Sequence, residues 1–482
     1  MIRSLIIILF FSAAASAAQS LNLGVKKTDL PEIGVVASNA MSIERELAVG
    51  DIYMRQLRAQ APMVNDPLLE EYIQDLGNKL VAQADNVKFP FTFFLLNSPE
   101  INAFAFFGGH IGVHTGLILN ADNESELASV LAHEITHVTQ RHMARRIESN
   151  QNSSPVQIAS LLGGILLAVA NPEAGMAAIS ASSAAAQQLS INYTRANEQE
   201  ADRLGMQMLS EAGFDTRGAA SFFGKLAEKY RFKSKPPAFL LTHPLPESRI
   251  ADARSRANLF PLRNPPPSLT FALAKARIIA RYTDRNGNSE HYFNKLLEQD
   301  SRIAQNAGHY GHALLQISEE NYQQAAETIA PLLENDPDNL FYLDTQTDIL
   351  LAKNQAEQAV ALLEPHLQKM PRNRVLSLNM ANALFQLKKF ERGTQILKDY
   401  LLVNPDHTLS YQMLIDAYAE NKQRMEMHQT RAEFYALLSV YPKAIDELQS
   451  AYNYTHDNTL EKQRIRARID QLRDADRKLK KL

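Results

Sequence analysis

The sequence of 482 residues contains no cysteine. This absence excludes thiol catalysis, cysteine-bound zinc, iron–sulfur clusters and disulfide bonds. Any metal ion that the side chains bind must therefore be held by histidine, aspartate or glutamate.

An excess of charge of one sign is also missing. The 50 Lys and Arg residues face 53 Asp and Glu residues, so the net charge is only −3. Binding of nucleic acid requires a basic surface, and this composition therefore argues against nucleic acid as a partner. Apolar residues make up 45% of the chain, which is typical of globular proteins, and the length fits roughly two to four domains.

The N-terminus lacks an apolar run of the roughly 20 residues that a membrane span needs. Arg3 is followed by a short apolar core at 5–11 and by small residues that end in an A-x-A pattern at 15–17. This order predicts a signal peptide over residues 1–18 that is removed after export. The alternative is an uncleaved membrane anchor. Export of a chain without cysteine fits the bacterial periplasm.

A Pro-rich stretch at 261–268 divides the rest of the chain. Proline cannot continue a helix, so we expect a stiff linker between one domain at 19–260 and a second at 269–482. Such a boundary predicts that the two domains have separable hydrophobic cores. The expected fold class is mainly α, with an α+β first domain and an all-α second domain.

The second domain carries an internal repeat. Pro337, Pro371 and Pro405 are spaced 34 residues apart, and each follows a helical stretch and a polar turn. Small residues recur at the same interval, at Ala325, Ala359 and Gly393. This period is typical of tetratricopeptide repeats, which form a solenoid of antiparallel helix pairs. The clear units are 306–339, 340–373 and 374–407, and degenerate units are expected at 272–305 and 408–475.

The first domain combines predicted helices with short strands. Hydrophobic periodicity predicts helices at 41–59, 66–84, 123–148 and 197–212 and strands at 89–96 and 111–115. Two apolar segments at 156–170 and 175–189 also look helical. They form either a buried hairpin or a surface that makes peripheral contact with a membrane. An integral membrane protease is a further interpretation of these two segments.

The predicted helix at 123–148 contains His133-Glu134-Ile135-Thr136-His137. Histidines at positions i and i+4 face the same side of a helix, so both imidazoles can hold one Zn²⁺. Glu134 points to that side and can act as the general base for a water molecule at the metal. This spacing predicts a zinc hydrolase.

The metal needs a further ligand. Metzincins use a histidine ten residues after the first one, but Met143 occupies that position. His142 lies five residues after His137, on a different face of a continuous helix. We therefore interpret His142 as a surface histidine or as one that supports a ligand from behind.

A second helix offers the missing carboxylate. Glu198 and Asp202 are also four residues apart, so both face one way. Glu198 can bind the metal while Asp202 accepts the N–H of a ligating histidine. Glu200 points roughly away from Asp202 and is the poorer candidate.

These motifs together resemble the zinc peptidases that include the CAAX prenyl endopeptidases and the HtpX heat-shock membrane proteases. The Asn-Ala-Phe-Ala segment at 102–105 and the glycine pair at 108–109 match the strand that precedes the zinc helix in this family. Phe107 departs from the proline of many members. The resemblance implies a zincin-like fold and one Zn²⁺ per chain. It implies the metal ligands His133, His137 and Glu198 and the catalytic residues Glu134 and Asp202.

The order of signal peptide, peptidase domain and repeats is similar to that of periplasmic proteases that act on outer-membrane β-barrels. This resemblance implies a chaperone-like role together with degradation of misassembled proteins. The implied partners are unfolded or stalled outer-membrane β-barrel precursors and the barrel-assembly machinery. The implied location is the periplasm, in association with the outer membrane.

His243 lies at 241–246, in a loop after the helix of Glu198, and Pro244 and Pro246 make this loop stiff. Three interpretations stay open. His243 is a surface-loop residue, it stabilises the oxyanion of the reaction, or it occupies the fourth position at the zinc and keeps the enzyme latent. The resemblance favours the latent form, with His243 as a metal ligand.

Two further alternatives concern function and substrate binding. The chain is either an endopeptidase or primarily a repeat-based chaperone or scaffold with latent protease activity. The strand upstream of the zinc helix is either an exposed edge that pairs with an extended substrate or a buried structural strand.

Overall fold

The computed structural model describes residues 41–149, 195–231, 239–240, 243–245, 247–283, 288–455 and 458–480. The predicted signal peptide and the two apolar segments at 156–189 lie outside these residues. Among the helices within them, none combines the length and the apolar character that crossing a membrane requires.

The first part of the chain is an α+β unit, as predicted. Its helices are α1 (Ile43–Gln60), α2 (Pro67–Val81), α3 (Thr115–Asn120), α4 (Glu124–Thr139), α5 (His142–Ser149), α9 (Arg195–Glu211), α10 (Arg217–Tyr230) and α12 (Glu247–Ala257). Its strands are β1 (Thr92–Leu96), β2 (Ala103–Phe106) and β3 (His110–His114).

The three strands form one sheet in the order β1-β3-β2. β1 pairs with β3 in parallel, whereas β2 and β3 form an antiparallel hairpin. Gly108 and Gly109 turn this hairpin with φ angles of 80° and 83°, which residues with a β-carbon rarely adopt. β2 is thereby an outer strand of the sheet, and α4 packs against it.

The predicted helix at 123–148 is wrong in one respect, because it is two helices. Asn123 caps α4 by accepting a hydrogen bond from the Glu126 N–H at 3.1 Å. The helix ends at Gln140, and Arg141 then takes a φ of 52°. The Arg141 guanidinium is buried and donates to Glu46 of α1 at 2.8 Å, which holds the chain in this turn. α5 therefore starts in a new direction.

The second part of the chain is a solenoid of helix pairs, which confirms the predicted tetratricopeptide repeats. Its helices are α13 (Leu269–Tyr282), α14 (Asn288–Leu297), α15 (Arg302–Ser318), α16 (Tyr322–Asn335), α17 (Leu340–Ala352), α18 (Ala356–Lys369), α19 (Arg374–Gln386), α20 (Phe390–Leu401), α21 (Thr408–Glu420), α22 (Arg424–Leu437), α23 (Tyr441–Asn453) and α24 (Thr459–Leu479).

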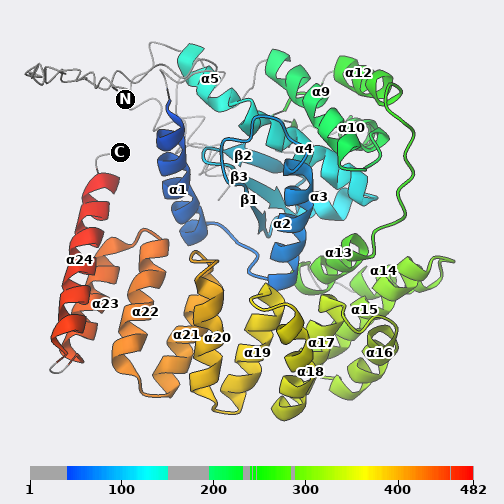
Figure 1. The fold of residues 1–482 in the computed structure, drawn as a ribbon. Helices are drawn as coiled ribbons and strands as arrows, with labels where there is room; N and C mark the ends of the chain where they lie inside the picture. Colours follow the sequence, from blue (N-terminus) through cyan, green and yellow to red (C-terminus); the bar gives the residue numbers. More distant parts are fainter. Residues whose placement is uncertain are drawn as a thin grey trace, which may run out of the picture.

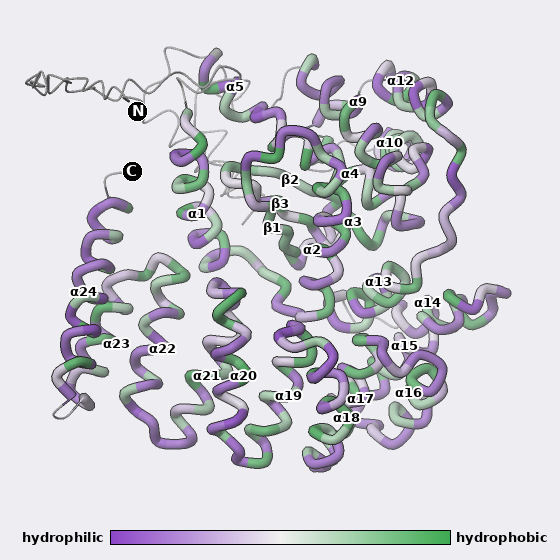
Figure 2. The backbone as a smooth tube through the Cα atoms, viewed as in Figure 1, coloured by the Kyte–Doolittle hydropathy of each residue, from purple (hydrophilic) through white to green (hydrophobic). Residues whose placement is uncertain are grey.

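The repeat positions have the expected roles. Ala325, Ala359 and Gly393 are buried in the second helix of successive pairs. A β-carbon on Gly393 would lie 2.4 Å from the ring of Phe385 in the preceding helix, so a larger residue here would require that ring to move. The first clear unit starts at Arg302 rather than at 306. Most repeat helices alternate hydrophobic and hydrophilic segments, whereas α24 is mainly hydrophilic (Figure 2).

The solenoid forms an arc, and the α+β unit sits on its inner side (Figure 1). α2 contacts α13 and α19, and α13 also contacts α3. The chain crosses between the two parts through the Pro-rich linker, where Leu259 and Leu262 are exposed. Apart from this linker, the two parts meet over a broad surface.

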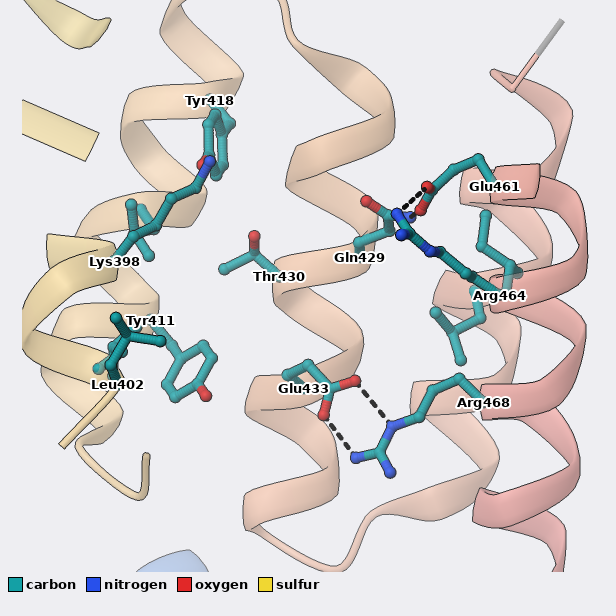
Figure 3. Close-up of a pocket in the computed structure, with 14 residues that line it drawn as sticks. Lys398, Leu402, Tyr411, Tyr418, Gln429, Thr430, Glu433, Glu461, Arg464 and Arg468 are labelled. Carbon is teal, nitrogen blue, oxygen red and sulfur yellow. Dashed lines mark hydrogen bonds and ion pairs between the residues drawn. The ribbon is translucent and has the colours of Figure 1, made fainter. Parts of the chain in front are cut away.

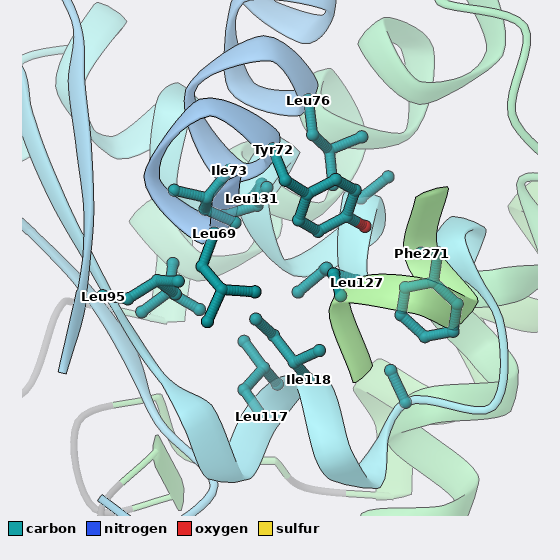
Figure 4. Packing of buried hydrophobic residues seen from close by; sticks show 14 of the residues in the cluster. Leu69, Tyr72, Ile73, Leu76, Leu95, Leu117, Ile118, Leu127, Leu131 and Phe271 are labelled. Atoms are coloured by element: carbon teal, nitrogen blue, oxygen red, sulfur yellow. The ribbon is translucent and has the colours of Figure 1, made fainter. Parts of the chain in front are cut away.

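The hydrophobic core does not stop at the linker. One continuous cluster of buried residues runs from Val64 through α2, α4 and α13 to Val375 in the repeats. Figure 4 shows Phe271 of α13 close to Leu127 of α4 within this cluster. The packing thus contradicts the expectation of separable cores, although the domain limits stay a prediction. A Pro-rich stretch predicts where the chain passes from one part to the other. It does not predict whether the two parts pack against each other once folded.

A buried ion-pair network joins the two parts. Arg277 of α13 is 1% exposed and contacts Asp66 at 2.6 Å and Asp344 of α17 at 2.9 Å. The Tyr310 hydroxyl lies 3.0 Å from the same guanidinium. Asp66 also caps α2 by accepting from the backbone of Leu68. Arg277 therefore links the start of α2 to three repeat helices.

The far end of the solenoid contains a groove of about 550 Å³ between α20, α21, α22 and α24 (Figure 3). Its floor includes Leu414 and Ile465. Arg468 of α24 forms a two-pronged ion pair with Glu433 of α22 at 2.8 and 2.6 Å. Part of the charge that lines the groove is thus neutralised within it.

We expect Arg277→Met to destabilise the full chain by about 3–5 kcal/mol, because it leaves two buried carboxylates without their cation. Urea denaturation measures this loss. The control is Arg392→Met, which removes a half-exposed ion pair with Glu364 and should cost at most about 1 kcal/mol. Equal losses for the two variants would contradict a structural role for the buried network.

Candidate metal centre

The centre is built by the close packing of α4 and α9. The backbone of Gly205 in α9 approaches Ala132 in α4, and a β-carbon on Gly205 would lie 3.2 Å from the Ala132 carbonyl. This contact places one turn of each helix face to face. His133, Glu134 and His137 come from α4, and Glu198 and Asp202 come from α9.

Four buried side chains converge at this point: His133, His137, Glu198 and His243. One ligand atom from each lies within 4.8 Å of the others, so the group could hold a metal ion. The Nε2 atoms of His133 and His137 are 2.9 Å apart. His243 Nδ1 lies 3.3 Å from His133 Nε2 and 3.1 Å from Glu198 Oε1. The arrangement brings together all four residues that we predicted as ligands.

The surroundings fit a divalent cation. Glu134, Glu198 and Asp202 are buried carboxylates, whereas Arg249 is the buried guanidinium that contacts two of them. A divalent ion together with Arg249 would balance the three negative charges, which burial otherwise makes costly. Glu134 is fully buried beside the ligand cluster, with His243 Nε2 at 3.4 Å from its Oε1. A buried carboxylate of this kind suits contact with a metal-associated water molecule.

The carboxylates differ in acidity. Burial raises the pKa of Glu134 above its ordinary value. Burial also acts to raise the pKa of Glu198, but the nearby His243 and His133 outweigh it and lower that pKa. Glu198 is therefore ionised and suited to binding a cation, whereas Glu134 is the more basic group.

Asp202 lies behind His133. Its Oδ1 is 3.0 Å from His133 Nδ1, on the side of the ring away from the other ligands. Arg249 donates to both oxygens of Asp202 at 2.7 Å. Burial would raise the pKa of Asp202, but the hydrogen bonds with His133 and Arg249 outweigh it and lower the pKa. An ionised Asp202 accepts a hydrogen bond from His133 Nδ1, and this orients Nε2 toward the other candidate ligands.

Comparison with known proteins agrees with this geometry. Residues 67–257 match the model of peptidase family M48, and residues 350–418 match a tetratricopeptide-repeat model. The chain is 44% identical over 452 residues to the β-barrel assembly-enhancing protease of Escherichia coli (strain K12), covering 94% of this chain and 92% of the relative. The putative β-barrel assembly-enhancing protease of Vibrio cholerae is 45% identical, with 92% of each chain covered.

The chain belongs to peptidase family M48. A more distant relative is the mitochondrial metalloendopeptidase OMA1 of Bos taurus, which is 31% identical over 37% of each chain. Membership confirms the predicted metalloprotease activity and the family that the motifs resemble.

His142 of this M48 peptidase lies behind His137, which is one of the two positions that the sequence left open. Its Nδ1 lies 2.8 Å from His137 Nδ1, and its Nε2 lies 3.1 Å from Glu200 Oε2. The side chain is fully buried, so the alternative of a surface histidine is wrong. The break after α4 makes this contact, because it turns α5 back toward His137.

The contacts of His142 decide its tautomer. Burial, partly offset by Glu200, lowers the pKa of His142 to about 4, so the ring is neutral at pH 7. A carboxylate only accepts, so Nε2 of His142 carries the proton and Nδ1 accepts from His137. His137 Nε2 then faces the other candidate ligands, 2.9 Å from His133 Nε2. Glu200, which we ranked as the poorer ligand, supports His137 from behind.

His243 is held firmly although it lies in a loop. Its side chain is 1% exposed, so the interpretation as a surface-loop residue is wrong. Its backbone N–H donates to the Phe239 carbonyl at 2.8 Å. The ring centroids of Phe239 and His243 lie 4.9 Å apart. His243 Nε2 also lies 3.4 Å from Glu134 Oε1. His243 thus contacts both the ligand cluster and the expected general base.

The strand β2, upstream of α4, has features of both alternatives, the sheet edge that pairs with substrate and the buried structural strand. β2 is an outer strand of the sheet, yet Ala103–Phe106 are all buried. Substrate pairing along β2 therefore stays a prediction.

We expect Asp202→Asn to weaken zinc affinity about 10–100-fold, since the amide no longer fixes the tautomer of His133. Competition with a chromophoric chelator measures the affinity. Asp252→Asn on the exposed side of α12 is the control and should leave it unchanged. Unaltered affinity in Asp202→Asn would rule out the supporting role.

Proposed function

We propose that this M48 peptidase is a zinc endopeptidase with one Zn²⁺ per chain, held by His133, His137 and Glu198. The observation that carries this proposal is the convergence of these side chains within 4.8 Å, together with His243. When bound, Zn²⁺ supplies Lewis acidity and lowers the pKa of a water molecule. The two imidazoles and one carboxylate are ligands that zinc prefers.

Glu134 is the general base in this proposal. Its raised pKa and its position beside the ligand cluster suit it to accept a proton from water and to pass that proton to the leaving amine. Asp202 orients His133 through the contact at Nδ1. An extended substrate would lie along β2, where backbone hydrogen bonds are indifferent to side chains and allow broad specificity.

His243 acts as a latch in this proposal. Its Nδ1 lies among the other ligand atoms, at 3.1 Å from Glu198, which is where a fourth ligand belongs. Four protein ligands close a zinc site, whereas a catalytic site keeps one position open. In this proposal the described arrangement corresponds to the latent form, and activity requires His243 to move away.

The proposed biological role is quality control of outer-membrane β-barrel proteins in the periplasm. It is supported by the similarity to the β-barrel assembly-enhancing protease of Escherichia coli and the putative one of Vibrio cholerae. The alignments with these two relatives cover most of this chain. The proposed clients are unfolded or stalled barrel precursors, and the proposed partner is the barrel-assembly machinery. The repeats support recruitment of such proteins, since tetratricopeptide arrays offer extended binding surfaces.

A second candidate function is a chaperone or scaffold in which the repeats do the main work. The closed ligand set around His243 favours it, because a latched protease would cleave only occasionally. The two functions differ in their dependence on Glu134.

We expect Glu134→Gln to retain zinc and to lose casein cleavage by at least about 10²-fold, because the amide cannot accept the proton. Zinc content and cleavage rate are measured on the same sample. Glu211→Gln, an exposed change on α9, is the control. Normal function of Glu134→Gln in cells would favour the chaperone role, and normal cleavage would contradict the assignment of the base.

We expect His243→Ala to raise basal proteolysis, because removal of the latch opens the fourth position at the metal. The rate of casein cleavage measures this effect, and His309→Ala, which changes an exposed histidine of α15, is the control. A loss of roughly 10²–10³-fold would instead support a role for His243 in stabilising the oxyanion.

A further inference from the structure

Arg249 is a buried cation at the base of the candidate metal centre. It lies in the first turn of α12, and its side chain is 5% exposed. A buried guanidinium is costly unless every donor is matched by an acceptor. Four contacts to acceptors match four of the five N–H donors of Arg249 and give it a definite orientation.

Its donors reach three separate groups. Nε and Nη2 donate to the two oxygens of Asp202, each at 2.7 Å. Nη1 contacts Glu198 Oε2 at 2.7 Å and donates to the Pro244 carbonyl at 2.8 Å. The aromatic ring of Phe223 lies 5.4 Å from the guanidinium carbon and limits its movement on another side.

Each of these groups controls a different candidate ligand. Asp202 lies 3.0 Å from His133 Nδ1, Glu198 is itself a ligand candidate, and Pro244 directly follows His243 in the chain. The guanidinium is planar and rigid, so the two bonds to Asp202 fix the directions in which Nη1 donates. A displacement of the Pro244 carbonyl therefore alters the same fork that orients Glu198 and Asp202.

We propose that Arg249 is a positioning residue that couples the seating of the His243 latch to the orientation of His133 and Glu198. The proposal rests on the metal site and the latch described under the proposed function. With His243 seated, Pro244 completes the hydrogen bonding of Arg249 and the ligand set is rigid. When His243 is released, Nη1 of Arg249 loses the Pro244 carbonyl as an acceptor. Arg249 then holds Glu198 and Asp202 less rigidly. Opening of the latch and loosening of the ligands are thus one event.

Cobalt titration of the metal-free full-length protein tests this coupling without reference to activity. Tetrahedral Co²⁺ absorbs strongly in the visible range, so both affinity and ligand geometry are read from one spectrum. The variant is Arg249→Lys, which keeps the charge and removes the fork. Arg256→Lys is the matched control, because Arg256 lies on the same helix and pairs only with Asp252 among the contacts described.

We expect Arg249→Lys to bind Co²⁺ at least about tenfold more weakly and to show the altered spectrum of His243→Ala. When His243 is already replaced by Ala, Arg249→Lys should weaken Co²⁺ binding by a smaller factor. The reason is that Arg249 then no longer couples the position of His243 to the other ligands. If Arg249 has a purely structural role, Arg249→Lys should weaken Co²⁺ binding by the same factor in the parent chain and in His243→Ala. Arg256→Lys should match the parent chain in both measurements.

Two results would overturn the inference and are distinguishable. Wild-type affinity and spectrum in a folded Arg249→Lys, or equal factors in the two backgrounds, would refute the role of Arg249 alone. A wild-type chain that binds no Co²⁺ would refute the proposed metal site and the coupling with it. If Arg249→Lys does not fold, as judged by circular dichroism, Arg249→Gln serves in the same comparisons, since it keeps two N–H donors without the charge.

Discussion

Burial of three carboxylates between α4 and α9 is the constraint on which the rest of the structure depends. Glu134, Glu198 and Asp202 lie in an interior where an unpaired charge costs several kcal/mol. The two helices can pack this closely only if cations lie between them. Arg249 supplies one positive charge, and the geometry of the histidines around Glu198 suits a divalent ion as the other. Metal binding and stability of this helix pair are thus expected to be linked.

One of the two histidines on α4 is supported from outside α4 and α9. His133 is backed by Asp202 of α9, but His137 is backed by His142 of α5, which is in turn held by Glu200. This second arrangement depends on the turn at Arg141, whose guanidinium is anchored to Glu46 of α1. A distant helix therefore contributes to the protonation state of a candidate metal ligand.

The solenoid is part of the same packed body as the peptidase unit. The continuous core and the network around Arg277 join α2 to the repeats, and α2 in turn packs against α4. Strain in the repeats would therefore reach the helix that carries His133 and His137 through well-packed side chains. This arrangement differs from that of two domains joined by a free linker.

Local spacing in the sequence by itself determined much of this protein. A four-residue interval on a helix places His133 beside His137 and Glu198 beside Asp202, and a 34-residue period predicts the helix pairs of the repeats, because both patterns follow from regular backbone geometry. The same reasoning identified the α+β unit and the metalloprotease motifs. Only the tertiary structure decided which elements meet. The left-handed turn at Arg141 brought His142 to His137, the loop at His243 reached the ligand cluster, Arg249 joined α9 to the loop that carries His243, and the core crossed the Pro-rich linker. Such contacts depend on the packing of whole faces, which no local spacing encodes.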